Sequence, residues 1–316
     1  MKPLITGIHH ITAIAGNAQA NIDFYTGILG LRLVKKTINF DAPDVYHFYF
    51  GDELGNPGTV FTTFPFQGAR KGTKGLGELT YTAFSIAKDS LDFWRARLEK
   101  YGVAISDTLT RFGEQLIRFE DHDGMGIELV ANDQDPRTGW TYGKIPLEYS
   151  IKGFYGATLY LKAKELTAKL LTEHMNYRFI DQEGSRFRYG TEGKPGDIVD
   201  ILVDPQGNRG MQSAGTVHHI AFRTANESTQ LEIQKILMEN GYLVTEVKDR
   251  NYFKSIYFRE PGGVLFEIAT DEPGFAIDEE EAHLGELIKL PEWAEPSREK
   301  IEKGLTPVEL NYQNYE

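Results

Sequence analysis

The chain contains no cysteine, fewer basic than acidic residues and no long apolar run. The missing cysteines exclude disulfides, thiolate metal ligands and cysteine nucleophiles, and they are typical of a reducing compartment. Lysine and arginine total 34 against 46 acidic residues, which gives a formal net charge of −12. Because basic residues form no run or stripe, we expect no binding to nucleic acid or to an anionic membrane surface.

The sequence also shows no targeting or membrane segment. No apolar stretch approaches the roughly 20 residues that a membrane helix needs, and the first residues lack the core of a signal peptide. We therefore expect a cytoplasmic protein. The chain does have material for a large core, since 41% of its residues are hydrophobic.

Four of the eight histidines stand in two tandem pairs at the start of similar apolar runs. His9 and His10 lie in "TGIHHITAIA", and His218 and His219 lie in "GTVHHIAFRT". Each run is followed by a polar break and then by apolar residues at helical spacing. The two pairs therefore indicate an internal repeat.

Four weak copies of one unit can be traced, each in the order β-α-β-β-β. Other first strands are expected at "LTYTAFSIA" and "FYGATLYLK", and the last copy ends in "YLVTEVK", "KSIYFRE" and "VLFEIAT". Alignment of the first strands makes equivalent His10, Tyr81, Gly156 and His219. Alignment of the last strands makes equivalent Thr62, Glu128, either Asp200 or Ile201, and Glu267. The fold class expected from this order is α+β.

The repeat also suggests where the domains divide. We expect a first domain at residues 1–140, a second at 141–270, and a linker in "NDQDPRTGWTYGKIP" (132–146). Residues 271–316 lie outside the repeat and form an acidic C-terminal tail. Its "DEEEAH" run is expected to be a solvated face.

Three side chains in this scheme predict a metal site. His10 and His219 hold equivalent places on two first strands, and Glu267 lies within the apolar run "GGVLFEIAT". A buried carboxylate costs several kcal/mol unless a cation meets it, and a divalent metal would do so. Two histidines and one carboxylate form the triad that holds Fe(II) and leaves coordination places open for O2 and substrate. Strand alternation requires both first or both second histidines of the pairs to be ligands, and does not say which.

The four copies, with the strings "GIHHIT", "YHFYFGD…GNPGTV", "GTVHHIAF" and "FREPGGVLFEIATD", resemble the vicinal oxygen chelate superfamily. This superfamily is also named after glyoxalase, bleomycin resistance proteins and dioxygenases. The resemblance covers roughly residues 5–270 and is nearest to ring-cleaving, extradiol-type dioxygenases of hydroquinones and catechols. It implies four βαβββ modules in two cup-shaped mixed-sheet domains, with the metal inside a cup.

The resemblance also implies roles for single residues. It selects His10 and His219 as ligands, and it brings His9 and His218 close to the site, which a strictly alternating strand does not allow without a bulge. Tyr257 is implied as a proton-transferring phenol and Arg250 as a cation for anionic oxygen species or a product carboxylate.

One metal per chain is expected, in a cup built from the first and fourth copies. The other cup offers Tyr81 and Gly156 at the histidine places and only Glu128 as a carboxylate. In the first copy the counterpart of Glu267 is Thr62, so three protein ligands remain, which suits oxygen activation better than a four-ligand isomerase site. Thr12 shares the face of His10 as a weaker candidate near the metal.

These features together predict a non-haem Fe(II) ring-cleaving dioxygenase that takes O2 and a small aromatic diol. Mn(II) could replace Fe(II) with the same ligands. The alternatives are a glyoxalase-like isomerase or lyase using Zn, Ni or Mn, and a non-catalytic protein that binds small molecules. The superfamily often dimerises, so a homodimer stays open.

Overall fold

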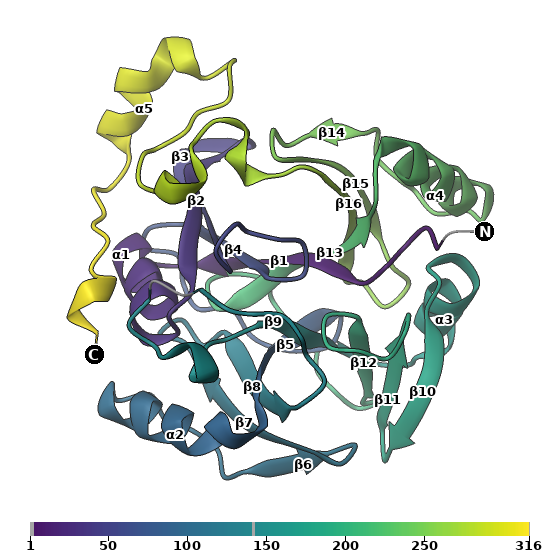
Figure 1. The fold of residues 1–316 in the computed structure, drawn as a ribbon. Helices are drawn as coiled ribbons and strands as arrows, with labels where there is room; N and C mark the ends of the chain where they lie inside the picture. Colours follow the sequence, from purple (N-terminus) through teal and green to yellow (C-terminus); the bar gives the residue numbers. More distant parts are fainter. Residues whose placement is uncertain (1–2, 141–142, 316) are drawn as a thin grey trace.

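The computed structural model of the chain describes residues 3–140 and 143–315. Two curled eight-stranded mixed sheets make up most of the fold, with few helices, which confirms the predicted α+β class (Figure 1). The predicted linker 132–146 includes residues 141–142, which lie outside the described residues, as do 1–2 and 316. No helix among the described residues is both long and apolar enough to cross a membrane.

All four modules have the predicted order of elements. Module 1 comprises β1 (Ile8–Ala15), α1 (Ala18–Ile22), β2 (Arg32–Asn39), β3 (Ala42–Gly51) and β4 (Val60–Pro65). Module 2 comprises β5 (Glu78–Ala87), α2 (Leu91–Lys100), β6 (Leu109–Arg111), β7 (Glu114–Glu120) and β8 (Gly126–Asn132). Module 3 comprises β9 (Gly153–Leu161), α3 (Glu165–Lys169), β10 (Arg178–Glu183), β11 (Arg186–Gly190) and β12 (Ile198–Val203). Module 4 comprises β13 (Thr216–Thr224), α4 (Glu227–Glu239), β14 (Lys248–Asp249), β15 (Phe253–Arg259) and β16 (Leu265–Pro273), and the tail adds α5 (Arg298–Gly304).

Each sheet joins two modules through their first strands. The first sheet has the order β14-β15-β16-β13-β1-β4-β3-β2, so β1 and β13 unite modules 1 and 4. The second sheet has the order β10-β11-β12-β9-β5-β8-β7-β6, so β5 and β9 unite modules 2 and 3. Each sheet thus takes one module from each half of the chain. The division into domains 1–140 and 141–270 stays a prediction.

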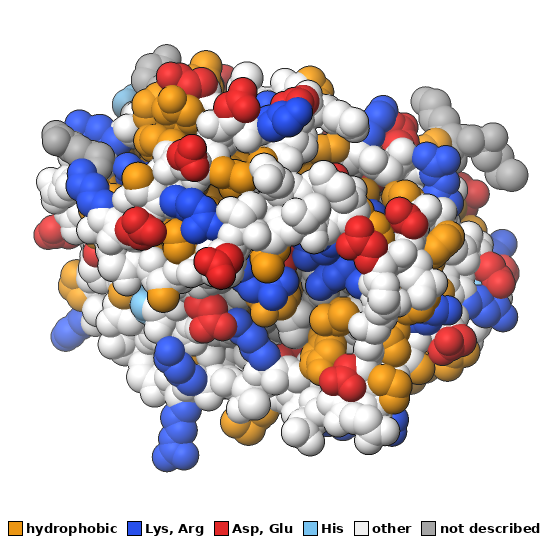
Figure 2. Space-filling model, turned by 90° about the horizontal axis from the view of Figure 1, so that it is seen from below, with side chains coloured by type: hydrophobic (Ala, Val, Ile, Leu, Met, Phe, Trp, Pro, Cys, Tyr) orange, Lys and Arg blue, Asp and Glu red, His pale blue; other side chains and the backbone are white. Residues whose placement is uncertain are grey.

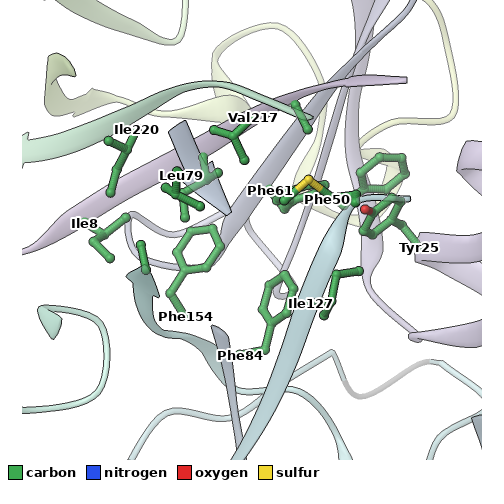
Figure 3. Close-up of a cluster of buried hydrophobic side chains, with 14 of the residues drawn as sticks. Ile8, Tyr25, Phe50, Phe61, Leu79, Phe84, Ile127, Phe154, Val217 and Ile220 are labelled. Carbon is green, nitrogen blue, oxygen red and sulfur yellow. The ribbon is translucent and has the colours of Figure 1, made fainter. Parts of the chain in front are cut away.

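The main core lies where the two sheets meet (Figure 3). Phe61 of the first sheet has its ring 6.2 Å from that of Phe84 in the second, and Phe84 stacks on Phe154 at 5.4 Å. All three side chains are fully buried, and burial of one such side chain is worth about 1.5–3 kcal/mol. Packing between these faces leaves the opposite face of each sheet free to form a cup.

The helices bury apolar residues at the helical spacing noted in the sequence. Leu91, Trp94 and Leu98 are the buried side of α2. Ile22 and Tyr25 are fully buried as well, although the helix that begins as α1 widens into a π-helical turn over Asp23–Ile28. Helical spacing of apolar residues is thus compatible with both the α-helical and the π-helical turn.

Two local predictions were wrong. The segment "YLVTEVK" (242–248) was expected to be a strand, but β14 begins only at Lys248. Thr245 explains the difference, because its Oγ1 accepts the Tyr257 N–H that a strand carbonyl would otherwise take. The "DEEEAH" run is solvated only in part: Asp278 and Glu279 both form ion pairs with the fully buried Lys35. The tail thereby packs against module 1, as the yellow ribbon in Figure 1 shows.

Candidate metal centre

His10, His219 and Glu267 come together inside the cup of the first sheet. His219 Nε2 lies 2.8 Å from Glu267 Oε2, and His10 Nε2 lies 3.4 Å from the same oxygen. The two Nε2 atoms are 3.3 Å apart, and all three side chains are buried. Within residues 3–140 and 143–315, this is the one group of three metal-ligating side chains whose donor atoms converge. The geometry agrees with the predicted triad.

Both preceding histidines lie at β-bulges. On β1, Ile8 pairs with Phe222 and His10 pairs with Ala221, so His9 is an extra residue without a partner of its own. His218 is the extra residue on β13 in the same way. A bulge breaks the alternation of faces, so both members of each pair lie on the cup side of the sheet. The bulged strand start that the resemblance required is therefore present.

The bulges let each first histidine orient the second. His9 Nε2 lies 3.1 Å from the carbonyl oxygen of Thr270, which can only accept a hydrogen bond. His9 Nδ1 is then an acceptor, and it lies 2.9 Å from His10 Nδ1, which must donate. The lone pair of His10 Nε2 is left facing Glu267. Such an outer hydrogen bond fixes the tautomer that a metal ligand needs.

The donor set fits a divalent cation. Glu267 Oε1 accepts a hydrogen bond from the Ser255 hydroxyl, whereas its fully buried Oε2 faces the two imidazole nitrogens. Burial opposes ionisation of Glu267, but the neighbouring His10 and His219 outweigh it and hold the pKa of the carboxyl well below its ordinary value. An ionised oxygen and two imidazole nitrogens then face one point, as a metal ligand set does.

A pocket of about 440 Å³ opens onto the group. Tyr257, Arg250 and His218 line it, and His9 does not. Arg250 Nε donates to the Tyr257 hydroxyl at 3.1 Å. Burial, followed by the charge of Glu267, raises the pKa of Tyr257, so this phenol keeps its proton at neutral pH. A hollow of about 930 Å³ meets the pocket at His218 and contains none of the three ligand side chains.

Sequence reasoning missed several residues of this pocket. His47, Tyr49 and Phe253 line it, and Ser255 bonds Glu267 behind it. The sequence held one signal for them, since His47 and Tyr49 alternate within "YHFYFGD" as Ser255 and Tyr257 do within "KSIYFRE". Thr12 lies near the group as expected, where it accepts a hydrogen bond from Thr62 at 2.8 Å.

The cup of the second sheet is filled by ion pairs. The guanidinium of Arg111 bonds both oxygens of the buried Glu128, at 3.0 and 2.6 Å, and Arg118 bonds Oε1 at 2.8 Å. Arg188 likewise bonds Asp200 at 2.9 Å. Figure 2, seen from the side of this sheet, shows Lys and Arg side chains gathered around a hollow in the middle of the face. Guanidinium groups thus meet the carboxylates that a metal would otherwise neutralise.

The fold and the three-residue group define the class of protein. The family model of the Glyoxalase/Bleomycin resistance protein/Dioxygenase superfamily matches residues 7–129 and 152–268, and the chain belongs to this superfamily.

Among its relatives, a provisionally named ring-cleaving dioxygenase of Bacillus subtilis, MhqO, is 48% identical over 304 residues, covering 96% of this chain and 97% of its own. The chlorohydroquinone/hydroquinone 1,2-dioxygenase of Sphingobium indicum is 35% identical over 305 residues, covering 94% and 95%. The crystal structure of a protein provisionally named a dioxygenase, also from B. subtilis, has a TM-score of 0.94 at 47% identity and covers 97% of this chain and 98% of its own.

Proposed function

We propose that the chain is a non-haem Fe(II) dioxygenase that opens the ring of a hydroquinone- or catechol-type diol. The observation that carries the proposal is the convergence of His10, His219 and Glu267 at a pocket that also holds Tyr257 and Arg250. The names of the relatives support ring cleavage as the reaction. Both atoms of O2 would enter the product as one ring carbon–carbon bond beside a hydroxyl-bearing carbon breaks.

The metal would be held by His10 Nε2, His219 Nε2 and Glu267 Oε2. When bound, Fe(II) would supply the redox chemistry between an electron-rich ring and O2, with coordination places left open by the three protein ligands. Mn(II) suits the same donors, and one ion per chain is proposed.

His218 and Tyr257 would handle protons. If His219 Nε2 faces the metal, its Nδ1–H donates to His218 Nδ1, 2.7 Å away, and His218 Nε2 then carries an N–H into the pocket. Burial lowers the pKa of His218 to about 3, so the ring is neutral at physiological pH and gives a hydrogen bond without a charge. Tyr257 retains its own proton and offers a second donor on the same side.

Arg250 and the aromatic walls would position the ring. Phe64 and Phe253 supply flat apolar surface on the lining of the pocket, which suits a planar ring. The Arg250 guanidinium bonds Tyr257 and also lies 3.5 Å from Asp41, which lines the same pocket. It can therefore receive an anionic oxygen of the ring or of the opened product.

The test is oxygen uptake by protein reconstituted anaerobically with Fe(II). We expect consumption with hydroquinones or catechols, none with the matching methoxy ethers, and both atoms of ¹⁸O2 in the opened product by mass spectrometry. The Glu267→Gln variant should consume none. An iron-loaded wild type that takes up no oxygen with any diol would contradict the proposal and favour the isomerase or the binding protein.

A further inference from the structure

Glu267 lies on β16, between the neighbouring strands β13 and β15, and its partners on these strands form a pattern. On β16, Glu267 pairs with Ala221 of β13, which stands two residues after His219, and with Tyr257 of β15. Ser255, two residues before Tyr257, donates its hydroxyl to Glu267 Oε1. The carboxylate is therefore oriented by a side chain of the neighbouring strand.

Module 1 repeats this arrangement on the other side of the metal group, by which we mean His10, His219 and Glu267. On β4, Thr62 pairs with Thr12 of β1, which stands two residues after His10, and with Tyr49 of β3. Thr62 therefore takes in module 1 the place that Glu267 takes in module 4, and Tyr49 is the counterpart of Tyr257. The same step of two residues along β3 leads from Tyr49 to His47, the counterpart of Ser255.

His47 is fixed by two hydrogen bonds. The Thr62 hydroxyl donates to Thr12 Oγ1 at 2.8 Å, so its oxygen receives the His47 Nε2–H, also at 2.8 Å. His47 Nδ1 is then the acceptor of the Tyr49 hydroxyl at 2.8 Å. Its ring also lies 4.4 Å from that of Phe64 between ring centroids. The imidazole is neutral, fully engaged and held against the pocket wall.

The other modules show that the strand position of Thr62 accepts a carboxylate. In the second sheet, Glu128 pairs with Ala83 of β5, and Asp200 pairs with Thr158 of β9. Ala83 and Thr158 stand two residues after Tyr81 and Gly156, the counterparts of the ligand histidines. Carboxylates thus occupy the equivalent place in modules 2, 3 and 4, and only module 1, which faces the metal group, has a threonine.

We propose that His47 is a specificity-determining residue of the metal group: it bonds the side chain at position 62, so that module 1 offers the metal no fourth protein ligand. The inference rests on the proposed function, because an oxygen-using centre needs coordination places that the protein leaves open. His47 acts through Thr62 and is a positioning residue. Its position in the pocket wall also limits which molecules reach that side.

The test copies the Ser255–Glu267 pair onto module 1 by making His47→Ser together with Thr62→Glu. We expect the Kd for Mn(II), measured by competition with a chelating dye, to fall about tenfold or more relative to wild type. The Mn(II) electron paramagnetic resonance spectrum should change, as a further carboxylate alters the ligand set. Oxygen uptake with Fe(II) and hydroquinone should be lost.

The matched control is His47→Ser with Thr62→Gln, which has the same shape without the charge and should keep the wild-type affinity. Thr62→Glu alone leaves His47 in place to bond the new carboxylate, so its Kd for Mn(II) should stay near the wild-type value. A double Glu variant that binds Mn(II) no more tightly than the Gln control would overturn the proposal. So would a Thr62→Glu variant that, with His47 still present, binds Mn(II) about tenfold more tightly than wild type. The affinity comparison decides this even if the wild type consumes no oxygen, so failure of the proposed function remains distinguishable.

Discussion

His219 Nε2 lies 2.8 Å from Glu267 Oε2, and the two residues stand on the neighbouring parallel strands β13 and β16. The same oxygen is 3.4 Å from His10 Nε2, which enters from module 1. One carboxylate therefore links the two ends of the repeat. In the absence of a cation its charge would be met by the imidazoles, which explains the lowered pKa of Glu267.

Replacing Glu267 by Gln should abolish tight metal binding. Gln keeps the shape and the bond with Ser255 but removes the charge that faces the two imidazoles. We expect the Kd for Mn(II) or Fe(II) to rise more than about 100-fold, since loss of an outer partner alone costs 10–100-fold. Titration calorimetry checks this, with the exposed Glu286→Gln as control. An unchanged Kd would place the ion elsewhere in the protein.

His9→Ala should weaken metal binding although His9 does not line the pocket. His10 Nδ1 loses its acceptor, and the chain of bonds to the Thr270 carbonyl is broken. The expected rise in Kd is about 10–100-fold. His283→Ala, in the exposed part of the tail, serves as the control variant. Equal affinity in both variants would mean that His10 holds its tautomer without His9.

Tyr257→Phe should lower kcat and leave the Kd of the metal near the wild-type value. The hydroxyl faces the pocket and bonds Arg250, but it is not one of the three converging ligands. Loss of a proton-transferring group typically costs about 10²–10⁴-fold in rate. Steady-state oxygen uptake with a hydroquinone measures the change. A kcat within a factor of about two of wild type would remove Tyr257 from proton transfer.

Arg111→Met should destabilise the second sheet. It leaves the buried Glu128 with Arg118 as its remaining partner, and breaking such a buried pair costs about 3–5 kcal/mol. Adding Glu128→Leu should restore part of the loss, because the stranded carboxylate is then gone. Urea unfolding of the two single variants and the double variant gives the coupling energy. Strictly additive costs would show that Arg111 and Glu128 do not stabilise each other.

Glu78 should make stability depend on pH. Burial raises the pKa of Glu78 to about 7 against an ordinary 4.5, with the Gly75 N–H and Lys74 opposing the shift. The folded chain therefore binds this proton more tightly than the unfolded chain, and the free energy of unfolding falls as pH rises from about 4.5 to about 7.

Glu78→Gln has no charge to bury. We expect its free energy of unfolding to exceed that of wild type by about 1–2 kcal/mol at pH 8 and to match it near pH 4. Solvent screens the carboxylate of Glu78 in part, which keeps the difference this small. Urea unfolding at several pH values gives the difference. Parallel pH profiles for the two proteins would exclude a raised pKa at Glu78.

The metal group could be predicted because its signal is local and repeated. Two histidine pairs at the heads of similar strands, with one glutamate in an apolar run, identify both pairs and Glu267 as the site without knowledge of the sheet. The order of modules then brings the first and fourth copies together. The cup and the ligand choice within each pair came from family resemblance, since strand alternation alone left two options.

What the sequence could not show depends on pairing between distant strands. The bulges at His9 and His218 exist only as a register between β1 and β13, 209 residues apart for the ligand histidines. The bond between His47 and Thr62 likewise needs β3 and β4 in register. The burial of Glu279 is a contact with Lys35, 244 residues away, which composition cannot reveal.

The pairing of β1 with β13 also means that the first sheet needs both ends of the repeat, whereas the second sheet does not. Modules 2 and 3 are neighbours in the chain, so the second sheet can close while the ribosome still holds module 4. His10 is made early but meets His219 and Glu267 only after almost the whole polypeptide has emerged. Capture of the proposed metal would therefore be a late step, because a chain that ends before Glu267 lacks one of the three converging side chains.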